Sequence, residues 1–148
     1  TPSRLVRIGV QGRCKSGPQK REIRFADSYP LHFCTLSSLE SLNSKLTEPV
    51  GIERFRPNIV LADSAPWAED SWSGLRIQQQ KFRIGKPCER CSITTVDPNT
   101  GQRGMEPLRT LAGFRRNAGG KIEFGHYLHS LPGAELAIGM EVFPETAP

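Results

Sequence analysis

Two cysteines, Cys88 and Cys91, form a Cys-x-x-Cys segment beside the cations Lys86 and Arg90. Thiols act as metal ligands or nucleophiles only as thiolates, and neighbouring cations favour ionisation of a thiol. A segment of this kind suits a soft, thiophilic metal or a redox reaction. The sequence therefore indicates one reactive thiol site in this chain.

The Cys-x-x-Cys segment alone leaves several interpretations open. A structural zinc site needs four ligands, and no second Cys-x-x-Cys or histidine pair stands at suitable spacing. A thioredoxin-like dithiol requires its first cysteine at a helix N-terminus, whereas a strand is expected after this segment. Two buried thiols near a turn are the third interpretation. The residues that could complete a zinc site in space are Cys14, Cys34, His32, His126 and His129.

Two further pairs of polar residues could bind or catalyse. Arg56 offers a forked donor for phosphates or planar acceptors, and Asn58 offers both a donor and an acceptor. Because Pro57 disfavours the helical region for the residue before it, we expect Arg56 to be extended and to share one side of the chain with Asn58. Glu69 and Asp70 could perform acid–base chemistry, although a carboxylate pair in a loop is more often exposed to solvent.

Composition and charge narrow the class of protein. The 148 residues suffice for one domain with a hydrophobic core, and the net charge is +5. Basic residues do not alternate with aromatic ones, so we expect no nucleic-acid partner. The densest basic cluster, residues 13–24, is either a solvated loop or a surface that attracts an anionic cofactor or an electron-transfer protein. No apolar run approaches the ~18 residues of a membrane span, and the absence of a secretory signal predicts reduced thiols in the cytoplasm.

The elements that must position these residues are short. Twelve prolines and fourteen glycines favour strands joined by frequent turns. Strands are expected over residues 5–10, 31–34, 58–61, 75–77, 81–84, 92–96, 121–124, 127–128, 135–137 and 141–143. The fold class that follows is mainly β, a β-barrel or curled sheet with a few short helices.

Two helices are expected between these strands. A capping box at residues 37–40 and leucines at helical spacing predict a helix over residues 38–46. A second helix is expected to begin with Pro107 at its first position. Cys34 ends the apolar run of residues 31–34, so we expect a small buried hydrophobe there.

Four motifs follow one another in a fixed order: FRPNIV at residues 55–60, AEDSW at 68–72, CERCSITTVDP at 88–98 and EPL at 106–108. Together they resemble the MOSC domain family, named for the C-terminal domain of molybdenum cofactor sulfurase. Within that family they are similar to the mitochondrial amidoxime-reducing component and its bacterial homologues. The resemblance runs from about Leu5 to Val142, and it implies a single MOSC-type β-barrel domain over residues 1–148.

The resemblance also implies a cofactor and its ligands. The second cysteine of the segment, Cys91, would be the catalytic residue and would bind the metal of a molybdenum cofactor (Mo-molybdopterin). Because molybdopterin is anionic and planar, Arg56 and Arg90 could meet its charge while Asn58 and Tyr127 bond its edges. The family's cofactor-contacting positions fall on Ser28, Tyr29, Arg56, Asn58, Glu89, Arg90 and Tyr127. The roles of Cys88, Asp70 and Trp72 stay open.

The function implied is that of an oxidoreductase domain that reduces N-hydroxylated compounds such as N-hydroxy bases and amidoximes. Electrons would come from a separate ferredoxin-, cytochrome b5- or flavin-reductase-like protein, since the plant-type ferredoxin cysteine pattern is absent. The family's N-terminal β-rich domain has no counterpart in this sequence, so we expect a C-terminal fragment that is inactive alone. One alternative is a non-catalytic carrier or sulfur-transfer module for the cofactor. The other is a structural domain with a zinc-bound or empty site.

Overall fold

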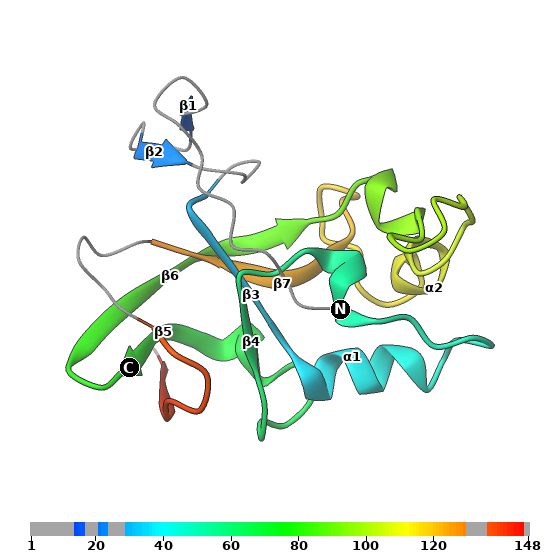
Figure 1. Cartoon of the computed structure of the whole chain (residues 1–148). Helices are drawn as coiled ribbons and strands as arrows, with labels where there is room; N and C mark the ends of the chain where they lie inside the picture. Colours follow the sequence, from blue (N-terminus) through cyan, green and yellow to red (C-terminus); the bar gives the residue numbers. More distant parts are fainter. Residues whose placement is uncertain (1–13, 17–20, 24–28, 130–135, 147–148) are drawn as a thin grey trace.

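The computed structural model describes residues 29–129 and 136–146 in full and the backbone of residues 14–16 and 21–23. Six strands form one sheet: β3 (Leu31–Thr35), β4 (Ile59–Leu61), β5 (Trp72–Ile77), β6 (Gln80–Glu89), β7 (Glu123–Leu128) and β8 (Val142–Thr146). Their order in the sheet is β4–β3–β7–β6–β5–β8, with β3 and β4 parallel and the other described neighbours antiparallel. Figure 1 shows that this sheet curls into a half-barrel. The expectation of a mainly β fold is confirmed.

Short helices and a small hairpin complete the described structure. Strands β1 (Cys14–Ser16) and β2 (Arg21–Ile23) form a separate antiparallel pair. The helices are α1 (Leu36–Asn43), α2 (Leu108–Ala112) and the 3₁₀ turns η2 (Ile52–Phe55), η3 (Ala68–Ser71) and η4 (Ser92–Thr95). In Figure 1, α1 continues directly from the end of β3, and α2 lies beyond the opposite end of β6 from the β5–β6 turn. Within the described part of the chain, no helix combines the length and the apolar character needed to cross a membrane.

The β5–β6 hairpin confirms the strand pair expected over residues 75–77 and 81–84. Leu75 pairs with Phe82 across the two strands, and Ile77 pairs with Gln80 at the turn. The alternation that predicted the strands also decides burial, since Leu75, Ile77 and Phe82 are buried while Lys81 is exposed. Their side chains form one hydrophobic cluster with Phe33, Leu61, Ile84 and Leu128.

Helix α1 begins two residues earlier than expected. Thr35 is its N-cap, and the Thr35 hydroxyl accepts a hydrogen bond from the backbone N–H of Ser38 at 3.3 Å. The capping box expected at residues 37–40 is therefore wrong: Thr35, at the buried end of β3, already supplies the capping oxygen. The expected inward positions Leu39 and Leu42 are buried.

Strand β3 buries both of its faces, which divides the core into two clusters. Phe33 belongs to the cluster beneath β5 and β6, whereas Cys34 packs with Leu42, Phe55 and Phe124. Cys34 is fully buried, and burial raises the pKa of its thiol. The prediction of a small buried hydrophobe at Cys34 is confirmed.

Other boundaries differ from the expected ones. The strand expected over residues 92–96 is wrong, because η4 occupies residues 92–95. The strands expected over residues 121–124 and 127–128 are one strand, β7, and residues 136–137 form no strand. Pro107 occupies the N-cap position of α2 and not its first helical position. The strand expected over residues 5–10 lies outside the described residues.

Candidate functional site

The Cys88 thiol and the Arg90 guanidinium meet at the end of β6. Cys88 is 4% exposed and packs against Tyr29 and Tyr127. Arg90 follows the strand, and its Nη1 donates to the sulfur of Cys88 at 2.7 Å. The Nε of Arg90 is buried and has no hydrogen-bond partner among the described residues. Lys86, the other expected cation, lies 3.6 Å from Glu89 in an exposed ion pair.

Arg90 also connects β6 to the turn η2. Its Nη2 donates to the carbonyl oxygen of Phe55 at 2.8 Å, and its guanidinium lies 5.5 Å from the centre of the Phe55 ring. Arg56, the next residue, adopts the left-handed conformation with φ 52° and ψ 48° and is exposed. The extended conformation expected for Arg56 is therefore wrong. The Arg56 N–H instead closes η2 by donating to Glu53 at 3.1 Å.

Asn58 is fastened to β3 by two hydrogen bonds. Its Oδ1 accepts from the backbone N–H of His32 at 2.7 Å, and its own backbone N–H donates to the His32 carbonyl at 2.8 Å. The His32 ring lies 5.7 Å from the Tyr127 ring and 3.6 Å from the Cys34 sulfur through Nε2. Burial, with the positive charge of Arg90 second, lowers the pKa of His32 to about 4, so this ring is neutral at pH 7.

Two tyrosines, Tyr29 and Tyr127, pack together with Cys88. The rings of Tyr29 and Tyr127 stack with centroids 4.8 Å apart, and both side chains are buried. The predicted site residue Ser28 lies outside the described residues.

Cys91 and Glu89 lie on either side of Arg90 and are both exposed. Cys91 is the N-cap of η4, and its carbonyl oxygen accepts from the N–H and the hydroxyl of Thr94 at 3.3 and 3.0 Å. The two thiols therefore differ, since Cys88 is enclosed and hydrogen-bonded whereas Cys91 faces solvent.

A continuous set of contacts joins four of the eight predicted site residues, namely Tyr29, Asn58, Arg90 and Tyr127. Asn58 contacts His32, His32 contacts Tyr127, Tyr127 packs with Tyr29 and Cys88, and Cys88 contacts Arg90. Arg56, Glu89 and Cys91 join this set through their chain neighbours. Among the described residues, no group of three or more His, Cys, Asp and Glu could hold a metal ion. The arrangement instead offers one exposed thiol, Cys91, next in the chain to Arg90, whose guanidinium is bonded to Cys88 and Phe55.

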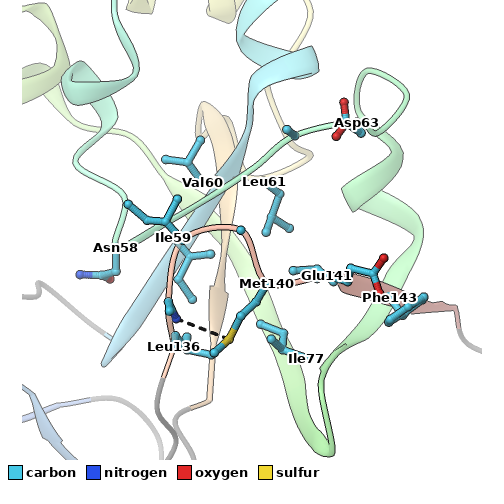
Figure 2. A pocket seen from close by; sticks show the side chains of 15 residues that line it. Asn58, Ile59, Val60, Leu61, Asp63, Ile77, Leu136, Met140, Glu141 and Phe143 are labelled. Atoms are coloured by element: carbon cyan, nitrogen blue, oxygen red, sulfur yellow. Dashed lines mark hydrogen bonds between the residues drawn. The ribbon is translucent and has the colours of Figure 1, made fainter.

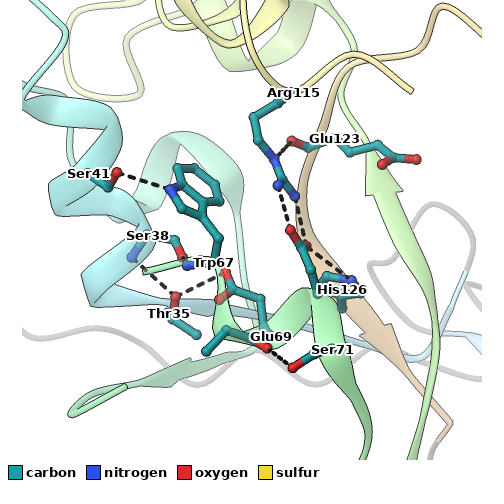
Figure 3. A network of polar contacts seen from close by, with 11 residues as sticks. Thr35, Ser38, Ser41, Trp67, Glu69, Ser71, Arg115, Glu123 and His126 are labelled. Atoms are coloured by element: carbon teal, nitrogen blue, oxygen red, sulfur yellow. Dashed lines mark hydrogen bonds and ion pairs between the residues drawn. The ribbon is translucent and has the colours of Figure 1, made fainter. Parts of the chain in front are cut away.

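The sequence did not predict a polar network that joins Asp70 in η3 to Arg115 and to His126 in β7. Asp70 accepts two hydrogen bonds from Arg115, at 2.5 and 2.8 Å, and its Oδ1 lies 3.7 Å from Nε2 of His126. The Arg115 guanidinium also lies 4.5 Å from the centre of the Trp67 ring. Figure 3 shows how these contacts link η3 with β7 and the segment before it. The open question about Asp70 is answered in part, since Asp70 binds a partner within the protein.

Glu69 and Trp72 also have internal partners. Glu69 is 1% exposed, and its carboxylate accepts from the Thr35 hydroxyl at 3.1 Å (Figure 3). The expectation that both acids face solvent is wrong for Glu69. Trp72 stacks on Phe33 at 6.3 Å and packs against the core, which gives Trp72 a structural role.

A hollow of about 710 Å³ lies between β4 and residues 136–143 (Figure 2). Aliphatic side chains such as Ile59, Leu61, Ile77 and Met140 line it, and Asp63 and Glu141 are its acidic residues. Of the site residues that the structure describes, Asn58 alone also lines this hollow. Among the described residues that line it, the hollow has no thiol, histidine or cation that would repeat the chemistry at Cys91.

Comparison with known proteins supplies the family. The model of the MOSC domain matches residues 20–143. Mitochondrial amidoxime-reducing component 1 from Homo sapiens is 41% identical over 98 residues, which cover 66% of this chain and 29% of the relative. The protein of the same name from Mus musculus is 40% identical over 120 residues, which cover 76% of this chain and 35% of the relative. Molybdenum cofactor sulfurase from Oryza sativa subsp. japonica is 34% identical over 160 residues, covering 93% of this chain and 19% of the relative. The chain thus spans no more than about a third of these relatives, and it belongs to the MOSC domain family.

Proposed function

We propose that this chain is the molybdenum-cofactor-binding domain of a cytoplasmic oxidoreductase that reduces N-hydroxylated compounds. The observation that carries the proposal is the position of Arg90. Its two terminal nitrogens hold Cys88 and the Phe55 carbonyl, so the segments bearing the exposed Cys91 and the exposed Arg56 are held near one another.

The donor set fits an anionic cofactor with a soft metal. A thiolate is a preferred ligand of soft transition metals, and Cys91 presents its sulfur to solvent. Arg56 is an exposed guanidinium that can bind a phosphate group. When bound, the cofactor supplies two-electron oxygen-atom transfer, which is the chemistry that removal of an N-hydroxyl oxygen requires.

The chain's own residues would bind and orient. Cys91 would provide the sulfur ligand, and Arg90 would fix the position of the segment that carries it. The Asn58 carboxamide has a fixed orientation, because its oxygen is held by the His32 N–H, and its nitrogen is therefore directed as a donor. The stacked Tyr29 and Tyr127 would form a rigid wall next to the cofactor. Glu89 would contact it from the exposed edge.

The substrate and the electron donor come from the likeness to the amidoxime-reducing components. Amidoximes and N-hydroxy bases are the substrate class, and a separate redox protein would supply the electrons. Because the chain spans 29% of the human relative, the remaining contacts to cofactor and partner would come from sequence beyond this domain.

A second function has its own support. Molybdenum cofactor sulfurase from rice aligns over 93% of this chain, more than the human amidoxime-reducing component does. A module that carries or sulfurates the cofactor would use the same exposed Cys91 without turning over an N-hydroxylated substrate.

The test is the molybdenum and pterin content of the full-length protein purified from a host that makes the cofactor. We expect near-stoichiometric molybdenum, lost in Cys91→Ala and kept in Ser92→Ala, which changes the exposed neighbour of the thiol. Reduction of an aromatic amidoxime by the loaded protein would support the reductase. Bound cofactor without turnover, or a persulfide on Cys91, would favour the sulfur-transfer module. Stoichiometric zinc, or no molybdenum at all, would refute both.

A further inference from the structure

The segment that follows Cys91 is tied to the turn that carries Arg56. Arg54 lies in η2, and its Nη2 donates to Oδ2 of Asp97 at 2.9 Å. Its Nη1 lies 3.5 Å from the carbonyl oxygen of Thr94 in η4. The side chain of Arg54 is 14% exposed and that of Asp97 is 31% exposed, so this ion pair is partly shielded from water. Such pairs are screened less than fully exposed ones.

Asp97 uses its two carboxylate oxygens for different purposes. Oδ1 accepts from the backbone N–H groups of Asn99 and Thr100 at 2.8 and 3.0 Å, which shapes the turn after η4. Oδ2 binds Arg54. The turn is closed further by backbone bonds from Gly101 to Asp97 and from Asp97 to Gln102, both at 2.8 Å. The hydrogen-bonded turn therefore directs the second carboxylate oxygen, Oδ2, to Arg54 in η2.

Both ends of the Arg54–Asp97 pair lie next to predicted site residues. Arg54 is in the same 3₁₀ turn that Arg56 terminates, and Thr94 is in the 3₁₀ turn that Cys91 begins. The Thr94 hydroxyl and N–H both donate to the Cys91 carbonyl, so a displacement of Thr94 would displace Cys91. The bond from Arg90 to the Phe55 carbonyl is a second tie between the same two segments.

Building on the proposed function, we propose that Arg54 and Asp97 are positioning residues that set the separation between the Cys91 thiol and the Arg56 guanidinium. Neither needs to touch the cofactor. Arg90 connects the end of β6 to η2, the turn that Arg56 terminates. The Arg54–Asp97 pair connects η2 to the turn that follows η4. Together the two contacts prevent η4 from rotating about its N-cap. They therefore also fix the direction of the Cys91 side chain.

Asp97→Asn is the variant that separates positioning from turn formation. Asparagine keeps an oxygen that can accept from Asn99 and Thr100, but it loses the charge that holds Arg54. The control is Glu145→Gln, which removes the same charge from an exposed ion pair with Lys81 at 3.2 Å, on β8. Both variants are made in the full-length protein.

Two measurements give the outcome. In the cofactor-free protein, we expect the backbone amides of Thr94 and Val96 to exchange hydrogen several-fold faster in Asp97→Asn. The hydrogen bonds that these amides donate, to the Cys91 and Ile93 carbonyls, hold η4 together. In the loaded protein, we expect kcat for amidoxime reduction to fall by about tenfold or more at similar KM and melting temperature, since misplacement of a reacting group costs that much. Glu145→Gln should change neither.

The outcomes separate this inference from the proposed function. Wild-type protein without molybdenum refutes the proposed function and the inference together. Molybdenum-loaded wild type, with unchanged exchange and kcat in Asp97→Asn, overturns the inference alone. A lower melting temperature with unchanged kcat per molybdenum also overturns it, because the pair would then stabilise the fold without positioning Cys91.

Discussion

Gly125 in β7 lies against residues 32–34 of β3, and its replacement by alanine should destabilise the protein strongly. Its φ is +73°, in the left-handed region that side chains other than glycine rarely adopt. A Cβ added there would lie 2.5 Å from Nε2 of His32, 2.6 Å from the Phe33 carbonyl oxygen and 2.7 Å from the Cys34 sulfur. The carbonyl cannot retreat without disturbing the pairing of β3 with β7.

The size of the effect follows from two costs. The left-handed conformation costs a non-glycine residue about 1–2 kcal/mol. Forcing a methyl group into a filled core costs about 1–3 kcal/mol more. We therefore expect Gly125→Ala to lower the free energy of unfolding by ~3 kcal/mol. For a chain of this length that corresponds to a melting temperature lower by roughly 10 °C.

Urea unfolding measures this change, with fluorescence of the partly buried Trp67 and Trp72 as the probe. The matched control is Gly120→Ala. Gly120 has φ +78° but no atom within 4 Å of the added Cβ, so this variant should lose only about 1 kcal/mol. Equal losses in the two variants would refute the reasoning, because the contacts around Gly125 would then contribute nothing.

Two predictions concern titratable groups. Because burial lowers the pKa of His32 from 6.5 to about 4, the unfolded chain binds a proton between these values that the folded chain does not. The free energy of unfolding should therefore decrease by about 3 kcal/mol as the pH falls from 6.5 to 4. Urea titrations over this pH range should show a shallower decrease in His32→Asn. Equal pH dependence in wild type and His32→Asn would contradict this. Asp70→Asn should cost about 1–2 kcal/mol, since it leaves Arg115, whose side chain is 16% exposed, without its carboxylate. Glu145→Gln is the control for that loss, and a similar small change in both variants would show that the Asp70–Arg115 pair contributes no more than an exposed one.

Features with a local cause could be predicted from the sequence. The alternation of Leu75, Ile77 and Phe82 predicted the hairpin correctly, because side chains on successive strand residues face opposite sides. The apolar run around Cys34 likewise predicted its burial. The order of four motifs indicated the MOSC family, which the family model and the relatives confirm.

The errors arose where side chains bond to the backbone or to distant partners. Thr94 and Thr95 are β-branched and indicated a strand, but their hydroxyls donate to the Cys91 and Ser92 carbonyls at 3.0 and 2.8 Å. Such bonds offer the backbone an alternative to the sheet. Glu69 was expected at the surface, and its burial depends on the Thr35 hydroxyl on another element. No pattern in the sequence near Glu69 indicates that Thr35 is its partner.

For the candidate site, residue types could be predicted but their orientations could not. The adjacency of Cys88, Arg90 and Cys91 is visible in the sequence. That Arg90 turns inward to Cys88 and Phe55 depends on η2 lying beside the end of β6. The left-handed Arg56 contradicts the average preference of residues before proline, which is a statistical tendency that tertiary contacts can override.

The order of strands in the sheet has a consequence for how the chain folds. Phe33 in β3 pairs with His126 in β7, so the centre of the sheet joins segments from opposite ends of the described chain. The β5–β6 hairpin can form from local contacts, whereas β3 and β4 must wait for β7 before they join it. Folding of such non-local sheets is slow, on the order of milliseconds to seconds. During synthesis, β3 and β4 would therefore leave the ribosome before the strand that joins them to the rest of the sheet, and the β3 edge would stay open to chaperones until β7 emerges.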